Sequence, residues 1–326
     1  MKKIFIALLA LIAVACAPKQ APLDPEVEVG PYTITNFTSG IYHIQDFNSS
    51  NPAGEEFDAE GNKTHFNNCS DMYLVVGDKE ALLIDLSNRI RWADNADESL
   101  RSLVAERIGD KPLTITMTHN HGDHTGMVPA FIDDPEVHFS LPQVDFEQLV
   151  QRVKIPAEQV SFYGDGKKYD LGGVVIDAVL VPGHTAGSMV FFVEGQDILF
   201  SGDAIGSGHG LWLYDVQTFR NYLWGFDNLM KYIDDPANGI NKEALRIYGG
   251  HYWQKDWFPE LGDDTFGMQY IDDMKVLIGQ VVDGSAATEP SNLDHRTIDT
   301  YFRYGQAIIA WNAAFAEEYR AELQEN

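Results

Sequence analysis

The chain has 326 residues, of which 44% are hydrophobic and 22% charged, and its formal net charge at pH 7 is -26. This composition is that of a folded protein with a sizeable core, and the length suits either two domains or one large α/β unit. Acidic residues are spread along the chain, so its surface repels nucleic-acid phosphates and anionic lipid headgroups. We therefore disfavour polynucleotide substrates and expect no nucleic-acid partner.

The first 15 residues are predicted to be a signal peptide. Two lysines form a positive n-region, and the apolar run that follows is too short to span a bilayer. The small residues before Cys16 resemble a bacterial lipobox, except that Ala13 stands where Leu is usual. We favour a lipoprotein that meets the membrane only through a lipid anchor at Cys16 in the cell envelope. The alternative is ordinary cleavage after Ala17 and a periplasmic protein.

After the signal peptide, the chain alternates predicted strands and helices. Residues 16–30 are proline-rich and form a tether, and the polar stretch 48–68 is a loop. Apolar, β-branched runs predict strands at 41–45, 72–76, 81–85, 113–117, 137–140, 174–180, 189–193, 197–200 and 246–248. Helical spacing predicts helices at 92–108, 125–131, 145–153, 219–232 and around 242–244.

Residues 265–326 are expected to form a C-terminal helical extension, ending in a helix over 308–323. Its role is open: the helices either pack on the preceding domain or make a homodimer.

A histidine-rich turn, residues 118–126, is the part of the chain with the clearest chemistry. It follows a predicted buried strand, and strand ends in layered α/β proteins are where reacting groups usually sit. His119 and His121 are two residues apart, so an extended backbone sends both side chains to the same side. Asp123 and His124 follow a glycine and can point at a second spot beside the first. Imidazole and carboxylate are ligands that zinc, iron and manganese accept. The alternative is a surface turn with the aspartate as a helix N-cap.

Three later strand-like runs also end in a potential metal ligand beside glycine: His184, Asp203 and His251. Each of them alone is an ordinary turn residue. Together, four strand ends supply seven ligand-type side chains, which one layered sheet could bring to one place.

These motifs resemble those of the metallo-β-lactamase superfamily, including glyoxalase II-like hydrolases and lactonases. The matching segments are His-Asn-His-Gly-Asp-His at 119–124, Gly-His-Thr-Ala-Gly-Ser at 183–188, Ser-Gly-Asp at 201–203 and Gly-His at 250–251. The predicted hairpin 72–85 also looks like the family's opening strands. The resemblance spans about 35–255 and implies an α/β fold of αββα type, two facing sheets with helices outside. We therefore expect a catalytic domain over 31–264.

The resemblance also implies an assignment of the ligands to two divalent metal ions, with zinc favoured and iron or manganese as alternatives. One ion would be held by His119, His121 and His184. The other would be held by Asp123, His124 and His251, and Asp203 would bridge the two.

The implied activity is metal-dependent hydrolysis, in which a metal-bound hydroxide attacks the carbonyl of an ester, thioester or lactone. The metals would stabilise the oxyanion, and Asp123 would be the catalytic residue that orients the hydroxide and carries a proton to the leaving group. His121 argues against family members that reduce oxygen at di-iron centres, which typically have Glu there. Asp203 argues against dedicated β-lactam hydrolases, which generally lack it.

Aromatic residues follow Asp203 and His251 and are either core or a substrate pocket. We hypothesise a pocket for a neutral or hydrophobic acyl compound, with substrate contacts from His209, Trp212, Tyr214 and Trp253. His209 and Tyr214 could reach the oxyanion. The sequence shows no dense Lys/Arg cluster beside these residues, which argues against glutathione thioesters and nucleotides.

Three other functions stay open: a mononuclear iron dioxygenase of sulfur compounds, a phosphodiesterase, and a non-catalytic binding lipoprotein. Four further histidines have no motif context and are interpreted as surface or structural residues: His43, His65, His138 and His295.

Overall fold

The computed structural model describes residues 27–46, 56–57, 63–65, 70–206, 210–251, 265–291, 293 and 295–325. The signal peptide, Cys16, most of the tether, and the candidate contacts His209 and Trp253 lie outside these ranges. Export, the lipid anchor and the domain boundaries therefore remain predictions. Among the described helices, none combines the length and apolar character needed to cross a membrane.

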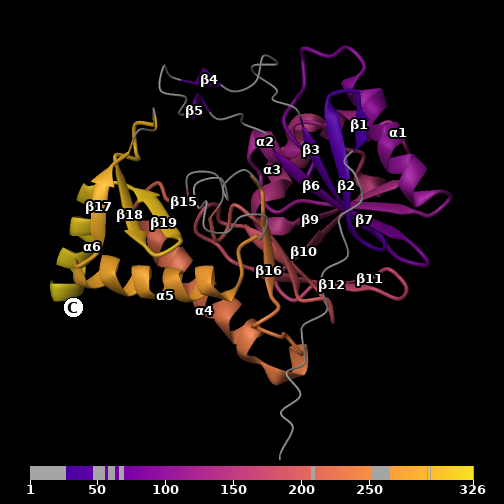
Figure 1. Ribbon diagram of the computed structural model, residues 1–326. Helices are drawn as coiled ribbons and strands as arrows, with labels where there is room; N and C mark the ends of the chain where they lie inside the picture. The colour runs from indigo at the N-terminus through magenta and orange to yellow at the C-terminus, as the bar shows by residue number, and fades with distance from the viewer. Residues whose placement is uncertain are drawn as a thin grey trace, which may run out of the picture.

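Eight strands form the N-terminal sheet, in the order β1-β2-β3-β6-β7-β8-β9-β10 (Figure 1). Neighbours are antiparallel from β1 to β7 and parallel from β7 to β10. The bounds are β1 Val27–Val29, β2 Tyr32–Thr38, β3 Ile41–Asp46, β6 Asp71–Val76, β7 Ala81–Ile84, β8 Leu113–Thr116, β9 Val137–Pro142 and β10 Val160–Tyr163. A separate two-stranded ribbon, β4 Glu56–Phe57 with β5 Lys63–His65, lies within the predicted loop 48–68.

Five strands form the central sheet, in the order β11-β12-β13-β14-β16. The pairs are antiparallel except for the last, β14 with β16. The bounds are β11 Lys168–Asp170, β12 Val175–Leu180, β13 Met189–Val193, β14 Ile198–Gly202 and β16 Arg246–Gly249.

The two sheets face each other across one shared core, and helices cover their outer faces. Alternation along each strand produces this arrangement, because successive side chains point to opposite faces. On β6, Tyr73 and Val75 join the core between the sheets, whereas Met72 and Leu74 pack outward beneath helices. Buried on both faces, such strands are apolar throughout. The expected αββα sandwich is confirmed.

The outer helices carry the complementary apolar faces. Helices α1 (Ala96–Ile108) and α3 (Gln143–Val153) pack on the N-terminal sheet. Helix α4 (Val216–Asp234) packs against the outer side of the central sheet, and the buried residues of α5 (Met268–Asp283) belong to the same hydrophobic cluster. The helix expected at 125–131 is two short pieces, α2 (Gly122–Thr125) and the 3-10 turn η1 (Val128–Ala130). Two other 3-10 turns are η2 (Ala157–Gln159) and η3 (Pro236–Asn238). Residues 242–244 form a turn, so the helix expected there is wrong.

The prediction of a wholly helical C-terminal extension is wrong. Between α5 and α6 (Ala313–Glu325) lie three strands, β17 Ala287–Pro290, β18 Thr300–Tyr304 and β19 Ala307–Trp311. They form the C-terminal sheet in the order β15-β19-β18-β17, with β15 (Leu211–Trp212) at one edge. Residues 307–311 are an apolar run buried on both faces, and periodicity cannot distinguish such a strand from a buried helix.

The C-terminal sheet shares a core with the central sheet rather than packing separately. One hydrophobic cluster contains Val190 and Phe192 of β13 together with Ile309 and Trp311 of β19. Figure 1 shows the C-terminal sheet (yellow) beside α5, which contacts β18 and β19. Residues after 265 therefore belong to the same body as the strands that end at the candidate site.

Candidate metal centre

All seven predicted ligands come together at the ends of β8, β12, β14 and β16. They form three overlapping groups, and within each group the candidate ligand atoms lie within 4.8 Å of one another. The groups are His119 with His121 and His184, His119 with His124 and Asp203, and Asp123 with His124 and His251. The side chains meet because the four strands end at the same edge of the two facing sheets.

The first group consists of three imidazoles. Nε2 of His184 lies 3.0 Å from Nδ1 of His121, and the ring centroid of His119 is 4.7 Å from that of His121. Two zinc ligands at about 2.0–2.1 Å from one ion in tetrahedral geometry lie about 3.3 Å apart. The spacing of His121 and His184 is therefore that of two ligands of one metal.

Two of these groups share no residue: His119, His121 and His184 are the first ligand group, and Asp123, His124 and His251 are the second. The second combines a carboxylate with two imidazoles. Oδ2 of Asp123 lies 3.5 Å from Nε2 of His251 and 3.9 Å from Nε2 of His124. These separations exceed ordinary hydrogen-bond lengths and suit atoms arranged around a common ion.

Asp203 lies between the two groups. Its Oδ2 is 3.6 Å from Nε2 of His184 and 3.6 Å from Nε2 of His251. Its Oδ1 is 3.7 Å from Nε2 of His124. One carboxylate thus faces ligands of both groups, the position that a bridging residue requires.

Asp85, at the end of β7, holds the histidine-rich turn from behind. Its carboxylate accepts hydrogen bonds from the backbone N–H of Thr118 at 2.6 Å and from the Thr118 hydroxyl at 2.7 Å. It also lies 3.0 Å from Nδ1 of His124. Because Thr118 Oγ1 donates to Asp85, it accepts from Nδ1 of His119, 3.0 Å away. In their neutral, metal-binding form both histidines therefore carry the proton on Nδ1 and direct the lone pair of Nε2 at the site.

Sequence reasoning missed Asp85, which it assigned to the end of a predicted strand. The available signal was a lone carboxylate directly after the apolar run Ala-Leu-Leu-Ile. Its partners could not be read from that signal, since His124 lies 39 residues away in the chain.

Three buried polar atoms at the centre have no hydrogen-bond partner among the described residues: Nε2 of His119, Nε2 of His124 and Oδ1 of Asp203. Leaving such atoms unpaired in a protein interior is costly. All three lie within the ligand groups and belong to imidazole and carboxylate, so the residues present fit a divalent metal.

The electrostatics of the metal-free centre favour the neutral, metal-binding form of histidines in the first group. Burial lowers the pKa of His184 to about 4 and that of His119 well below its usual range. Both imidazoles are thus neutral at pH 7, the form that binds metal. Burial opposes ionisation of Asp203, but His251 and His124 outweigh it and hold the Asp203 pKa well below its usual range.

The glycine before His251 allows Asp203 and His124 to pack directly against the backbone. A Cβ on Gly250 would lie 2.4 Å from Oδ1 of Asp203 and 2.6 Å from Cε1 of His124. The N–H of Asp71 donates to the carbonyl of Gly250 at 2.9 Å, and the Tyr73 hydroxyl donates to the carbonyl of Gly249 at 2.5 Å. Strand β6 therefore fixes the turn that presents His251.

Two of the four predicted substrate contacts can be placed. The ring centroid of Tyr214 lies 6.2 Å from that of His121 and 5.9 Å from that of His184. Trp212 accepts a hydrogen bond from Nδ1 of His184 through its backbone carbonyl at 3.1 Å, so the lone pair of His184 lies on Nε2, the atom that faces His121. Trp212 and Tyr214 are therefore both neighbours of the first group.

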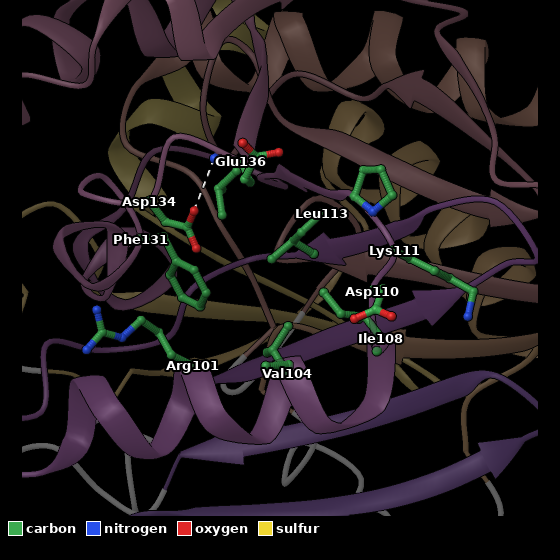
Figure 2. Close-up of a pocket in the computed structure, with 13 residues that line it drawn as sticks. Arg101, Val104, Ile108, Asp110, Lys111, Leu113, Phe131, Asp134 and Glu136 are labelled. Atoms are coloured by element: carbon green, nitrogen blue, oxygen red, sulfur yellow. Dashed lines mark hydrogen bonds between the residues drawn. The ribbon is translucent and has the colours of Figure 1, made fainter.

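A separate hollow of about 340 Å³ lies away from these ligands (Figure 2). Its apolar wall includes Ile108 at the end of α1, Phe131, and Leu113 and Val137 at the starts of β8 and β9. The candidate ligands follow the other end of β8. None of the seven lines this hollow.

Comparison with known proteins identifies the class that this fold and centre define. The family model of the metallo-beta-lactamase superfamily matches residues 70–252, and the chain belongs to that superfamily. The matched segment contains all seven candidate ligands, which confirms the family resemblance drawn from the motifs.

Curated relatives of the chain include fungal thioesterases. An atrochrysone carboxyl ACP thioesterase from Aspergillus chevalieri is 28% identical over 197 residues, covering 59% of this chain and 55% of that protein. Lactamase-like protein adaB from Aspergillus niger is 31% identical over 180 residues, covering 53% of this chain and 50% of that protein. The chain thus spans about half the length of these relatives.

Solved structures show the same fold at low identity. A metallo-beta-lactamase from Pontibacter korlensis has a TM-score of 0.52 and 16% identity, covering 76% of this chain and 99% of that one. The DIM-1 metallo-beta-lactamase has a TM-score of 0.51 and 16% identity, covering 78% of this chain and 99% of that one. These matches establish the fold alone.

Proposed function

We propose that the protein is a metal-dependent hydrolase that cleaves a thioester, ester or lactone with a neutral or hydrophobic acyl group. The observation that carries this proposal is the set of buried, unpaired atoms on His119, His124 and Asp203. They converge with the other four candidate ligands at the strand ends. The superfamily match and the relatives named thioesterases support the same reaction class.

In this proposal the ligand groups hold two divalent ions, most simply zinc because its usual ligands are imidazole and carboxylate. His119, His121 and His184 hold one ion, and Asp123, His124 and His251 hold the other, with Asp203 between them. When bound, such ions act as Lewis acids and lower the pKa of water to about 7.

Asp123 is the residue we propose for proton transfer. Its side chain is 27% exposed, compared with 12% for the other carboxylate, Asp203. A carboxylate that reaches both the centre and the open side can accept the proton of the attacking water. It can then deliver that proton to the leaving oxygen or sulfur.

Tyr214 is the candidate donor to the developing oxyanion. Burial, together with the carboxylates of Asp203 and Asp123, raises the pKa of its hydroxyl. The phenol therefore keeps its proton at neutral pH and can donate a hydrogen bond beside the first ligand group.

Two measurements test this function: the metal content of the purified protein, and its turnover of a panel of substrates. We expect turnover of neutral thioesters, esters or lactones, with about two divalent ions per chain. Exclusive turnover of phosphodiesters would replace the proposal with a phosphodiesterase. One iron per chain with oxygen consumption would replace it with a dioxygenase.

A further inference from the structure

The C-terminal sheet reaches the candidate metal centre through its edge strand. Strand β15 pairs in parallel with β19, Leu211 opposite Ile309 and Trp212 opposite Ala310, and the N–H of Leu213 donates to the carbonyl of Ala310 at 3.0 Å. The carbonyl of Trp212 is the acceptor for His184. The sheet that follows residue 265 thus fixes the strand that orients a candidate ligand.

A second contact comes from His295, between β17 and β18. Its ring centroid lies 5.8 Å from that of Trp212 and 5.6 Å from that of Tyr214. Tyr214 in turn is the ring neighbour of His121 and His184. The rings of Trp212, Tyr214 and His295, which we call the aromatic wall, therefore run from the first ligand group to the C-terminal sheet.

The hydrogen bonding of His295 determines what it can offer. The Thr297 N–H donates to Nδ1 of His295 at 3.4 Å, and the Thr297 hydroxyl lies 3.0 Å from the same atom. Nδ1 is therefore an acceptor, and the neutral ring carries its proton on Nε2. No hydrogen bond to Nε2 occurs within the described part of the chain, and the ring is half-buried.

All three members of the aromatic wall are half-buried, so each residue keeps part of its surface accessible. Their ring faces and edges can pair with another aromatic ring. The O–H of Tyr214 and the N–H of His295 add two hydrogen-bond donors. A planar, oxygen-bearing ring matches this combination, whereas a small aliphatic acyl group would leave it unused.

We propose that the aromatic wall is a specificity element that selects substrates with an aromatic acyl group, and that His295 is its outer member. This inference rests on the proposed hydrolase function and narrows its substrate class. It also assigns a role in substrate selection to the residues after 265.

The test compares S-benzoyl- and S-acetyl-N-acetylcysteamine, which differ only in the acyl group. Replacing His295 by Ala is expected to lower the benzoyl-to-acetyl ratio of kcat/KM about tenfold, the scale of one lost aromatic pair. His295→Phe, which returns a ring to the same place, is expected to restore most of the ratio. His138→Ala is the matched control and should leave the ratio unchanged, because His138 lies on β9 and contacts Ser161.

Equilibrium binding of benzoate and acetate to the metal-loaded protein separates this inference from the proposed function. A preference for benzoate that His295→Ala abolishes supports the aromatic wall even if neither thioester is turned over. Thioester turnover with the ratio and the benzoate preference unchanged in His295→Ala would overturn the aromatic wall and leave the hydrolase standing. Thermal unfolding and metal content of the variants show that the fold and the centre are intact.

Discussion

Oδ2 of Asp85 lies 3.0 Å from Nδ1 of His124, and both residues are almost wholly buried. The same carboxylate holds the backbone and hydroxyl of Thr118, whose hydroxyl orients His119. One aspartate outside the ligand set thus sets the tautomer of a histidine in each ligand group. Partners of this kind position metal ligands and raise their basicity.

Asp85→Asn is expected to weaken metal binding about 10- to 100-fold, the usual effect of losing such a partner. Asparagine keeps the shape and tolerates the positive φ of this position, 66°, but it cannot accept from three donors at once. Competition with a chromophoric chelator measures the affinity. The exposed Asp110→Ala serves as control, and equal affinities in the two variants would contradict the role of Asp85.

Gly250→Ala is expected to destabilise the protein by about 1–3 kcal/mol through overpacking and to disrupt metal binding. The added Cβ would lie 2.4 Å from Oδ1 of Asp203. Gly279→Ala is the matched control: apart from its chain neighbours and the backbone of its own helix α5, no heavy atom lies within 4 Å of its Cβ position, so it should stabilise by about 0.5–1 kcal/mol. Urea unfolding and metal analysis check both, and a normally loaded Gly250→Ala protein would be inconsistent with this geometry.

Asp123→Asn is expected to lower kcat by about 100- to 10,000-fold, the range for losing a general base or acid. KM should change far less, because the amide keeps the size of the side chain and an oxygen that can face the metal. Steady-state kinetics at matched metal content provide the measurement. Retention of more than half of the wild-type kcat would show that proton transfer does not use this residue.

Removal of metal is expected to lower the melting temperature. The folded protein would then bury unpaired atoms on His119, His124 and Asp203. Metal at about 1,000 times its Kd contributes about 4 kcal/mol by mass action. Scanning calorimetry before and after chelation, followed by zinc re-addition, measures the change. If the three scans coincide, the side chains do not form a metal centre.

Metal uptake at pH 7 is expected to release about two protons. Burial lowers the pKa of His124, but the carboxylates of Asp203, Asp123 and Asp85 outweigh it and raise that pKa to about 9. His251 is also buried, but Asp203 and Asp123 outweigh burial and raise its pKa well above the usual range. Both imidazoles are therefore protonated in the metal-free protein and must lose a proton to become ligands.

The sign of the pH dependence follows from these two groups. Below the raised pKa values the proton competes with the metal, so affinity increases with pH from 7 to 9, by about tenfold per unit for each proton released. Titration calorimetry in two buffers of different ionisation enthalpy counts the protons. Uptake with no proton release would show that both histidines are already neutral.

Much of the fold and all seven candidate ligands could be predicted from the sequence because the signals are local. Every ligand lies in a short turn that contains a glycine and follows an apolar strand, and each strand is short and bounded by turn residues. Such patterns need only neighbouring residues. The strands of the C-terminal extension were not predicted, because the five buried residues of β19 show no periodicity that distinguishes a strand from a helix.

The tertiary structure alone decided which residues support the centre. Asp85 reaches His124 across 39 residues, and the Trp212 carbonyl reaches His184 across 28. His295 lies beside Trp212 and Tyr214 because the C-terminal sheet includes β15 at its edge. These contacts depend on how distant strands pack and pair. A side chain's local sequence specifies its chemistry, but its partners follow from packing.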